Sequence, residues 1–111
     1  MFNEEIELLL TTLKVAFAFL FYEGDEETFI VYSEMDKDNA LSGDDEVIGC
    51  VSYCDFDIYS KTNYTTIMNN LIDLMVSAGW TYQPSRDSPD MYERDTKYYH
   101  KTLCFAKERE I

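Results

Sequence analysis

The chain has 111 residues, a formal net charge of −13 at pH 7, and a hydrophobic fraction of 46%. This length and composition fit a single globular domain spanning residues 1–111 and exclude a disordered chain. The charge argues against binding nucleic acid through its phosphates or binding an anionic membrane surface, because both need clustered lysine and arginine.

The N-terminal part predicts a helix followed by two strands. Residues 3–14 place apolar side chains at helical spacing, and Asn3 followed by two glutamates suits an N-cap. Residues 15–22 and 28–35 are rich in aromatic and β-branched residues, and the short turn at Gly24 between them predicts a hairpin.

The apolar run near the N-terminus is interrupted by two threonines and Lys14 and is preceded by glutamates. It therefore predicts neither a secretory signal nor a membrane span. Three cysteines in a chain without a predicted signal indicate reduced, cytosolic thiols that act as small buried side chains.

The central part predicts a polar loop at 36–46 and a long strand at 47–59. On this strand the even positions form a face that points inward, and the odd positions form a face whose second half is exposed to solvent. The even positions are Ile48, Cys50, Ser52, Cys54, Phe56 and Ile58, and the odd positions end in Asp55, Asp57 and Tyr59.

The C-terminal part predicts a helix at 63–80 with Gly79 as its stop, a loop at 83–95 and a last strand at 96–108. Strands that do not alternate regularly with helices favour an α+β fold. We expect an antiparallel sheet of about four strands with two main helices packed against it.

The loop at 36–47 has some features of an EF-hand calcium loop, since Asp36 and Asp38 occupy its first and third positions. However, Leu41 stands where the sharp turn needs glycine, and Val47 stands where a bidentate glutamate belongs. The pattern therefore favours a solvated loop over a calcium site.

A zinc site would need Cys50, Cys54, His100 and Cys104 to converge. Four residues along a strand span roughly 13 Å, whereas two thiolates on one zinc ion lie only about 4 Å apart. We therefore predict two buried cysteines on the inner face of one strand and a third on another strand, with no metal and no cofactor.

Two catalytic arrangements remain to be weighed. His100 is the single histidine, and a nucleophilic pair would need a cysteine beside it. Asp55 and Asp57 lie roughly 7 Å apart on one strand face, a separation near that of an inverting glycosidase. A small sheet offers little cleft for a sugar, so these residues do not predict an enzyme. We instead expect Asp55 and Asp57 to face solvent or a neighbouring subunit.

The order of short features resembles the small tail-terminator or tail-completion proteins of long-tailed bacteriophages and prophages. The resemblance rests on an N-terminal helix, on FIVYSEMDKDNA, on DDEVIGCVSYCDFDIYSKTN, on GW after a helix, and on YERDTKYYHKTLCFAKERE. It implies a ring, typically of six copies, that caps the tail tube, stops its growth and forms the surface on which the head docks.

The resemblance also implies the partners and the place of action. These are further copies of the chain, the tail-tube protein and head or neck proteins, in a virion tail assembled in the bacterial cytoplasm. DNA would pass through the ring rather than be bound, and an acidic wall would repel its phosphates. Carboxylates pointing away from the lumen of an assembled ring would contradict this last hypothesis.

The residues expected at interfaces come from the long polar loops and the wet strand face. They are Asp38, Asp44, Asp45, Tyr53, Asp55, Asp57 and Arg86. Two alternatives stay open: another neck protein, such as a head-completion or stopper ring, and an acidic interaction protein that mimics DNA.

Overall fold

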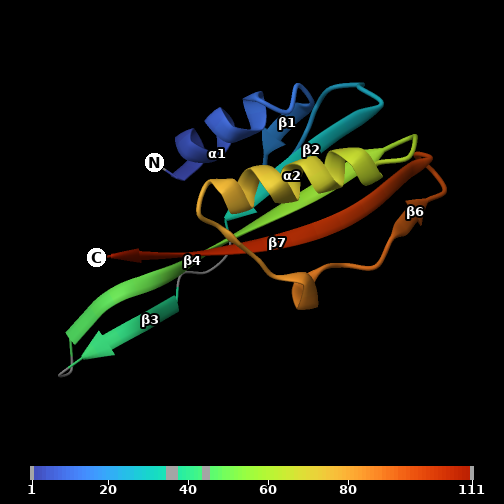
Figure 1. Cartoon of the computed structure of the whole chain (residues 1–111). Coiled ribbons are helices and arrows are strands. Elements are labelled where there is room, and N and C mark those ends of the chain that lie inside the picture. Colours follow the sequence, from blue (N-terminus) through green and yellow to red (C-terminus); the bar gives the residue numbers. More distant parts are fainter. Residues whose placement is uncertain (1, 35–37, 44–45, 111) are drawn as a thin grey trace.

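The computed structural model describes the backbone of residues 2–34, 38–43 and 46–110, and the side chains of residues 4–34 and 51–108. Two helices lie on one face of a twisted sheet in this part of the chain (Figure 1). The elements are α1 (Phe2–Thr11), β1 (Ala16–Phe19), β2 (Thr28–Glu34), β3 (Asp38–Gly43), β4 (Glu46–Ser60), α2 (Thr65–Ser77), β5 (Thr81–Tyr82), a 3₁₀ turn (Pro84–Arg86), β6 (Met91–Glu93) and β7 (Tyr98–Glu110).

The α+β class is confirmed, but the sheet has seven strands in the described residues rather than about four. Its main path runs β1-β2-β4-β7-β5, while β3 adds to β4 and β6 adds to β7. Short edge strands such as β5 and β6 carry too few residues for a period-two pattern, and therefore the sequence shows them only as loop.

The predicted hairpin between the first two strands is wrong, because β1 pairs with β2 in parallel. The register joins Ala16 to Phe29 and Phe19 to Tyr32. Leu20 adopts a left-handed φ of 71°, and the following residues carry the chain back to the starting end of β1. The other strand pairs of the described residues are antiparallel.

The predicted polar loop at 36–46 is also partly wrong, because Asp38–Gly43 forms strand β3 against the beginning of β4. We call β3 and residues 46–51 of β4 the arm. It extends away from the part of the sheet that the helices cover (Figure 1), in a chain whose principal extents are 53 × 26 × 24 Å. The backbone of so long a strand needs a hydrogen-bonding partner, and β3 supplies one.

The core lies between the sheet and the helices. The predicted inner face of β4 is confirmed from Ser52 to Ile58, since every even position there is at most 1% exposed. Ile48 and Cys50 fall outside the described side chains. The other fully buried apolar residues of the cluster are Ile6 and Leu10 of α1, Leu71 and Met75 of α2, Ile30 and Tyr32 of β2, and Leu103 and Phe105 of β7.

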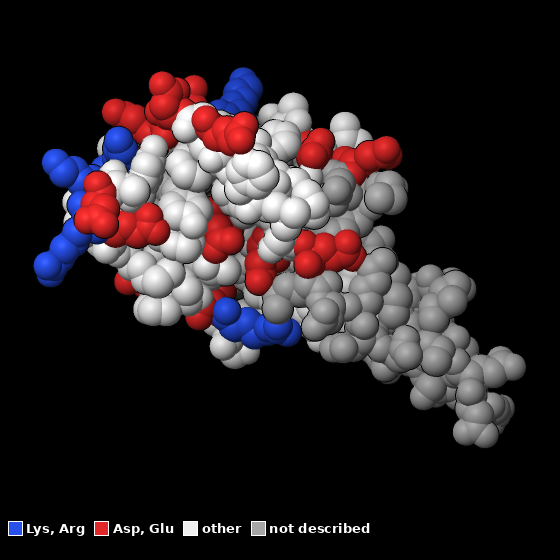
Figure 2. Space-filling model, turned by 180° about the vertical axis from the view of Figure 1, so that it is seen from behind, with Lys and Arg blue, Asp and Glu red and all other residues white. Residues whose placement is uncertain are grey.

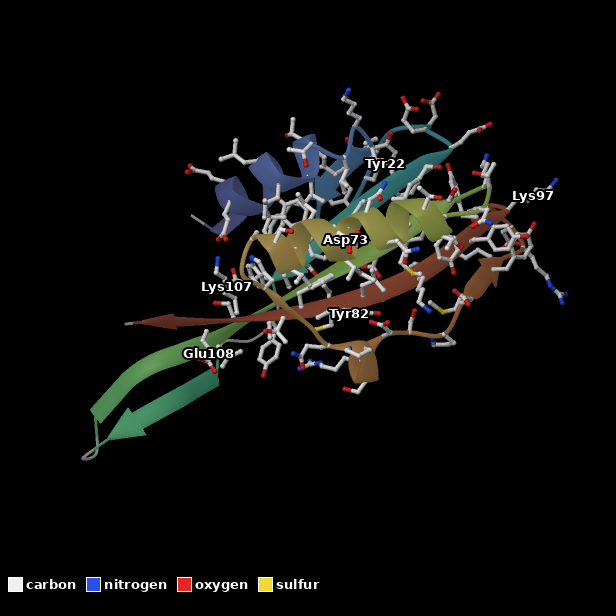
Figure 3. The ribbon with its side chains drawn as sticks, in the orientation of Figure 1. Tyr22, Asp73, Tyr82, Lys97, Lys107 and Glu108 are labelled. Carbon is white, nitrogen blue, oxygen red and sulfur yellow. The ribbon has the colours of Figure 1, made fainter. Side chains whose placement is uncertain are left out.

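Polar bonds at the margin of the core hold the N-terminal helix in place. Lys107 of β7 donates to Glu5 of α1 at 2.9 Å and to the carbonyl of Ala78 at 3.2 Å (Figure 3). The hydroxyl of buried Tyr32 donates to Glu7 at 2.6 Å. The predicted N-cap is wrong, because α1 begins at Phe2 and Asn3 lies inside it. None of the helices described is long and apolar enough to span a membrane.

The predicted stop of α2 at Gly79 is confirmed. Gly79 has a φ of +95°, the N–H of Trp80 bonds to the carbonyl of Met75, and the N–H of Gly79 bonds to the carbonyl of Val76. This is a Schellman motif, which satisfies the last carbonyls of the helix. It also turns the chain so that Trp80 enters the core.

We expect Gly79→Ala to lower the free energy of unfolding by about 1–2 kcal/mol, because a side chain is strained at this positive φ. An added Cβ would meet Lys107 at 3.7 Å, which is an ordinary contact, so the cost comes from the backbone. Gly79→Asn is the control, since asparagine tolerates the left-handed region better. Urea unfolding measures both variants, and an equal loss in the two would contradict a backbone cause.

Candidate interaction surface

Neither of the two helices described packs against the second face of the sheet (Figure 1), which we call the open face and which Figure 2 shows from behind. The strand register brings side chains of three strands together on it. They are Phe29 and Val31 of β2, Tyr53, Asp55, Asp57 and Tyr59 of β4, and His100, Thr102, Cys104 and Ala106 of β7. The prediction that Asp55 and Asp57 share the face opposite the core is thus confirmed.

Asp57 occupies the middle of the open face and is held by two neighbours on β7. Its Oδ1 atom lies 2.9 Å from Nε2 of His100 and accepts a 2.6 Å hydrogen bond from the hydroxyl of Thr102. The side chains of His100 and Asp57 are 16% and 28% exposed. The carboxylate is therefore fixed in direction while part of it still meets solvent.

Aromatic rings form a continuous stack beside this carboxylate. The ring centroids are 4.2 Å apart for Tyr22 and Phe29, 4.9 Å for Phe29 and Tyr59, and 4.1 Å for Tyr59 and His100. The planes within each pair differ by only 15–17°. Tyr98 packs edge-on against Tyr59 and Phe29. The stack crosses the sheet and forms a stiff apolar border to Asp57.

Asp55 lies further along β4, opposite Cys104 of β7. Burial raises the pKa of Asp55, while a hydrogen bond with Cys104 lowers it, the charge of Asp57 raises it and that of Arg86 lowers it. Burial, followed by the hydrogen bond with Asp55, raises the pKa of the Cys104 thiol to about 12. The open face therefore holds one carboxylate that is poorly solvated.

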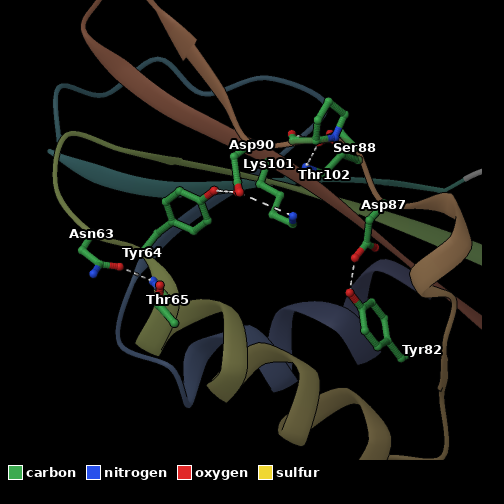
Figure 4. A network of polar contacts seen from close by, with 10 residues as sticks. Asn63, Tyr64, Thr65, Tyr82, Asp87, Ser88, Asp90, Lys101 and Thr102 are labelled. Carbon is green, nitrogen blue, oxygen red and sulfur yellow. Dashed lines mark hydrogen bonds and ion pairs between the residues drawn. The ribbon is translucent and has the colours of Figure 1, made fainter.

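The guanidinium of Arg86 lies 4.6 Å from the centre of the Tyr53 ring. Its position depends on the segment 83–90, which is tied to the rest of the fold (Figure 4). Asp87 accepts a hydrogen bond from Tyr82, and Asp90 accepts one from Tyr64. The N–H of Thr102 donates to Oγ of Ser88 at 2.8 Å, and the N–H of Ser88 donates to the carbonyl of Thr102 at 3.0 Å.

The structure thus brings four of the seven predicted interface residues together on or beside the open face: Tyr53, Asp55, Asp57 and Arg86. The backbone of Asp38 begins β3 and pairs with Val51 at the base of the arm, and its side chain is outside the described set. Asp44 and Asp45 lie outside the described residues. Sequence reasoning missed the contact between His100 and Asp57, whose only signal is that both occupy outward positions of predicted strands.

The thiols do not converge. Cys54 points into the core, whereas Cys104 lies on the open face, and both are buried and free. His100 pairs with Tyr59 in the register, so it does not reach Cys54. Within the side chains described, no three His, Cys, Asp or Glu residues are placed to hold a metal ion. Cys50 and the whole calcium-like loop at 36–47 lie outside that set.

We compared the chain with known protein families and with curated proteins. No family model matches it, and no curated protein does.

Replacing Asp55 with asparagine is expected to raise the midpoint of thermal unfolding by about 2–4 °C. The amide keeps the shape and an acceptor for Cys104, and it removes the charge that burial disfavours. Asp73→Asn is the matched control, because Asp73 is exposed on α2. Calorimetry at pH 7 measures both variants, and a lower midpoint for Asp55→Asn than for the control would contradict the assignment of a poorly solvated carboxylate.

Proposed function

We propose that the chain is a structural assembly protein of a bacteriophage tail, a tail-terminator subunit that forms a ring on the tail tube, ends tube growth and provides the head-docking surface. It would act in the virion tail after assembly in the bacterial cytoplasm. The observation that carries the proposal is the arm. An extended pair of strands that leaves the helix-covered body places backbone edges beyond the reach of the subunit's own core (Figure 1).

Such a pair of strands is poorly stabilised alone, because an isolated two-stranded ribbon is marginal in water. β4 and β7 run 15 and 13 residues and extend the pairing to Gly49 and Glu110, which supports the base of the arm. A neighbouring subunit that covers the rest would stabilise the arm and define a repeated contact. Head-to-tail contacts of this kind close into rings when the rotation between copies allows it.

The first test is the absolute mass of the protein in solution by light scattering, over a range of concentrations. A closed species near six copies is expected. A persistent monomer requires a second step, in which the protein is mixed with purified tail tubes and attached subunits are counted by electron microscopy. A monomer that also fails to cap tubes contradicts the proposal and favours the alternative of an acidic interaction protein that mimics DNA.

Replacing Asp44 and Asp45 together with asparagine is expected to reduce ring formation or tube capping at least five-fold and to leave the unfolding midpoint within about 2 °C of wild type. In the sequence, the two aspartates fall between the last residue of β3, Gly43, and the first residue of β4, Glu46. The matched control is Glu4→Gln with Asp73→Asn, which removes two charges from the helical side. Equal loss of assembly in the control would show a general charge effect.

A further inference from the structure

The open face has the composition of a protein contact surface rather than of a solvated sheet face. Phe29 and Tyr59 are only partly exposed, and Val31 and Cys104 are 8% and 1% exposed, although no helix lies over them. Aromatic residues and arginine are the side chains that protein interfaces favour. This face carries the aromatic stack and, at one end, Arg86 over Tyr53.

The charge on this face is uneven. Asp55 and Asp57 occupy its middle, while Arg86 lies over Tyr53 at one end and Lys61 lies 5.0 Å from the Tyr98 ring at the other. Figure 2 shows acidic side chains across the middle of the face and also along its upper margin, whereas the basic side chains lie only toward the margins of the part drawn in colour. A partner that covers the middle must therefore meet two carboxylates, one of which is already poorly solvated.

Two of the possible occupants are disfavoured by this charge. A second copy docked face to face would bring four carboxylates together, and opposed like charges are costly in an interface. A nucleic acid would bring phosphates to an acidic surface. A positively charged partner has the opposite effect, because its cations would neutralise Asp55 and Asp57 and relieve the cost of burial.

The surroundings favour a guanidinium over an ammonium group. Guanidinium is planar, stacks on aromatic rings and bonds to carboxylates in a two-pronged geometry. Rings of Tyr53 and Tyr59 border the carboxylates on the same strand, and Arg86 on Tyr53 is an example of this stacking within the chain. Tyr59 lies between the rings of Phe29 and His100, so it offers an incoming guanidinium its edge. Asp55 and Asp57 alternate along β4, so their side chains lie roughly 7 Å apart, as do alternate side chains of an extended peptide.

We propose that the open face binds an extended, arginine-bearing segment of another protein, with arginines at alternate positions bonded to Asp55 and Asp57 and packed between the ring of Tyr53 and the edge of the aromatic stack at Tyr59. This proposal is independent of ring formation, because it concerns a contact with a different chain. It predicts that the surface prefers a side chain that is both positively charged and planar.

The test uses the full, isotope-labelled chain and three synthetic peptides, followed by amide chemical shifts. The probe is acetyl-Gly-Arg-Gly-Arg-Gly-amide. The second peptide replaces arginine with citrulline, which keeps the shape and removes the charge, and the third replaces it with lysine. We expect shifts concentrated on β4 and β7, no saturable binding of the citrulline peptide, and binding of the lysine peptide at least three-fold weaker than that of the probe.

Variants then assign the carboxylates. Asp55→Asn combined with Asp57→Asn is expected to raise the dissociation constant of the probe at least five-fold, and Asp55→Asn alone at least two-fold. Asp55→Asn alone leaves the bonds from His100 and Thr102 to Asp57 in place, so it remains informative if the double variant folds poorly. Glu4→Gln with Asp73→Asn is the control and should change the constant less than two-fold.

Three results would overturn the proposal. The first is an equal rise in the dissociation constant of the probe for the control variant, which would show attraction by net charge alone. The second is a set of shifts centred on the helices. The third is loss of a wild-type oligomer in the double variant by light scattering, which would make the open face a contact between copies of this chain.

Discussion

Replacing Phe56 with alanine is expected to lower the free energy of unfolding by about 3–5 kcal/mol. Phe56 is fully buried on β4, and its ring lies 5.5 Å from that of Phe105 and 6.4 Å from that of Tyr32. It therefore joins three adjacent strands beneath the helices. Domains of this size are stable by only about 5–15 kcal/mol, so the variant would be close to unfolding at room temperature.

Urea unfolding followed by tryptophan fluorescence measures this loss, because Trp80 belongs to the same core. Phe21→Ala is the matched control: the same atoms are removed from a side chain that is 65% exposed. It should change the free energy of unfolding by no more than about 0.5 kcal/mol. A loss below 1 kcal/mol for Phe56→Ala would mean that the inner face of β4 does not pack as described.

Alkaline unfolding is expected to give the second large effect. Burial, together with hydrogen bonds to Asp90 and Asp87, raises the pKa values of Tyr64 and Tyr82 from 10.0 to about 12. Burial raises the pKa of Cys104 from 9.0 to about 12. The folded state thus favours the protonated form of each group. The stabilisation that each protonated group gives the folded state is complete below pH 9 and is lost as the pH rises to about 12.

The loss should be on the order of 2 kcal/mol for each group across this range. Thermal unfolding measured at intervals from pH 8 to pH 11.5 should show a stable plateau and then a steep fall. Tyr64→Phe and Tyr82→Phe remove one titrating group each, and their profiles should fall less steeply. Tyr92→Phe alters a half-exposed ring and serves as the control. Parallel profiles for all variants would contradict this origin of the alkaline transition.

Much of the fold is readable in the sequence where periodicity is strong. The inner face of β4 and the helix α2 follow directly from alternation and from helical spacing, because burial of one face requires those patterns. Gly79 ends α2 because the chain needs a positive φ there. These predictions concern neighbours in sequence, where local physics determines the outcome.

The parts that sequence reasoning missed depend on distant partners. The segment Asp38–Gly43 has the composition of a loop and becomes a strand because β4 extends alongside it. The parallel pairing of β1 depends on a left-handed Leu20, a conformation that leucine rarely adopts and that no pattern signals. The contact of His100 with Asp57 depends on the register of β7 on β4, set by residues more than forty positions apart.

The position of β7 within the sheet has a consequence for folding. β7 follows in sequence all the strands that it pairs with, yet it is an internal strand, flanked by β4 on one side and by β5 and β6 on the other. Its Lys107 also bonds to Glu5, which lies 102 residues earlier in the sequence. The sheet cannot close until β7 has paired, so a chain truncated before residue 98 should lack the finished fold.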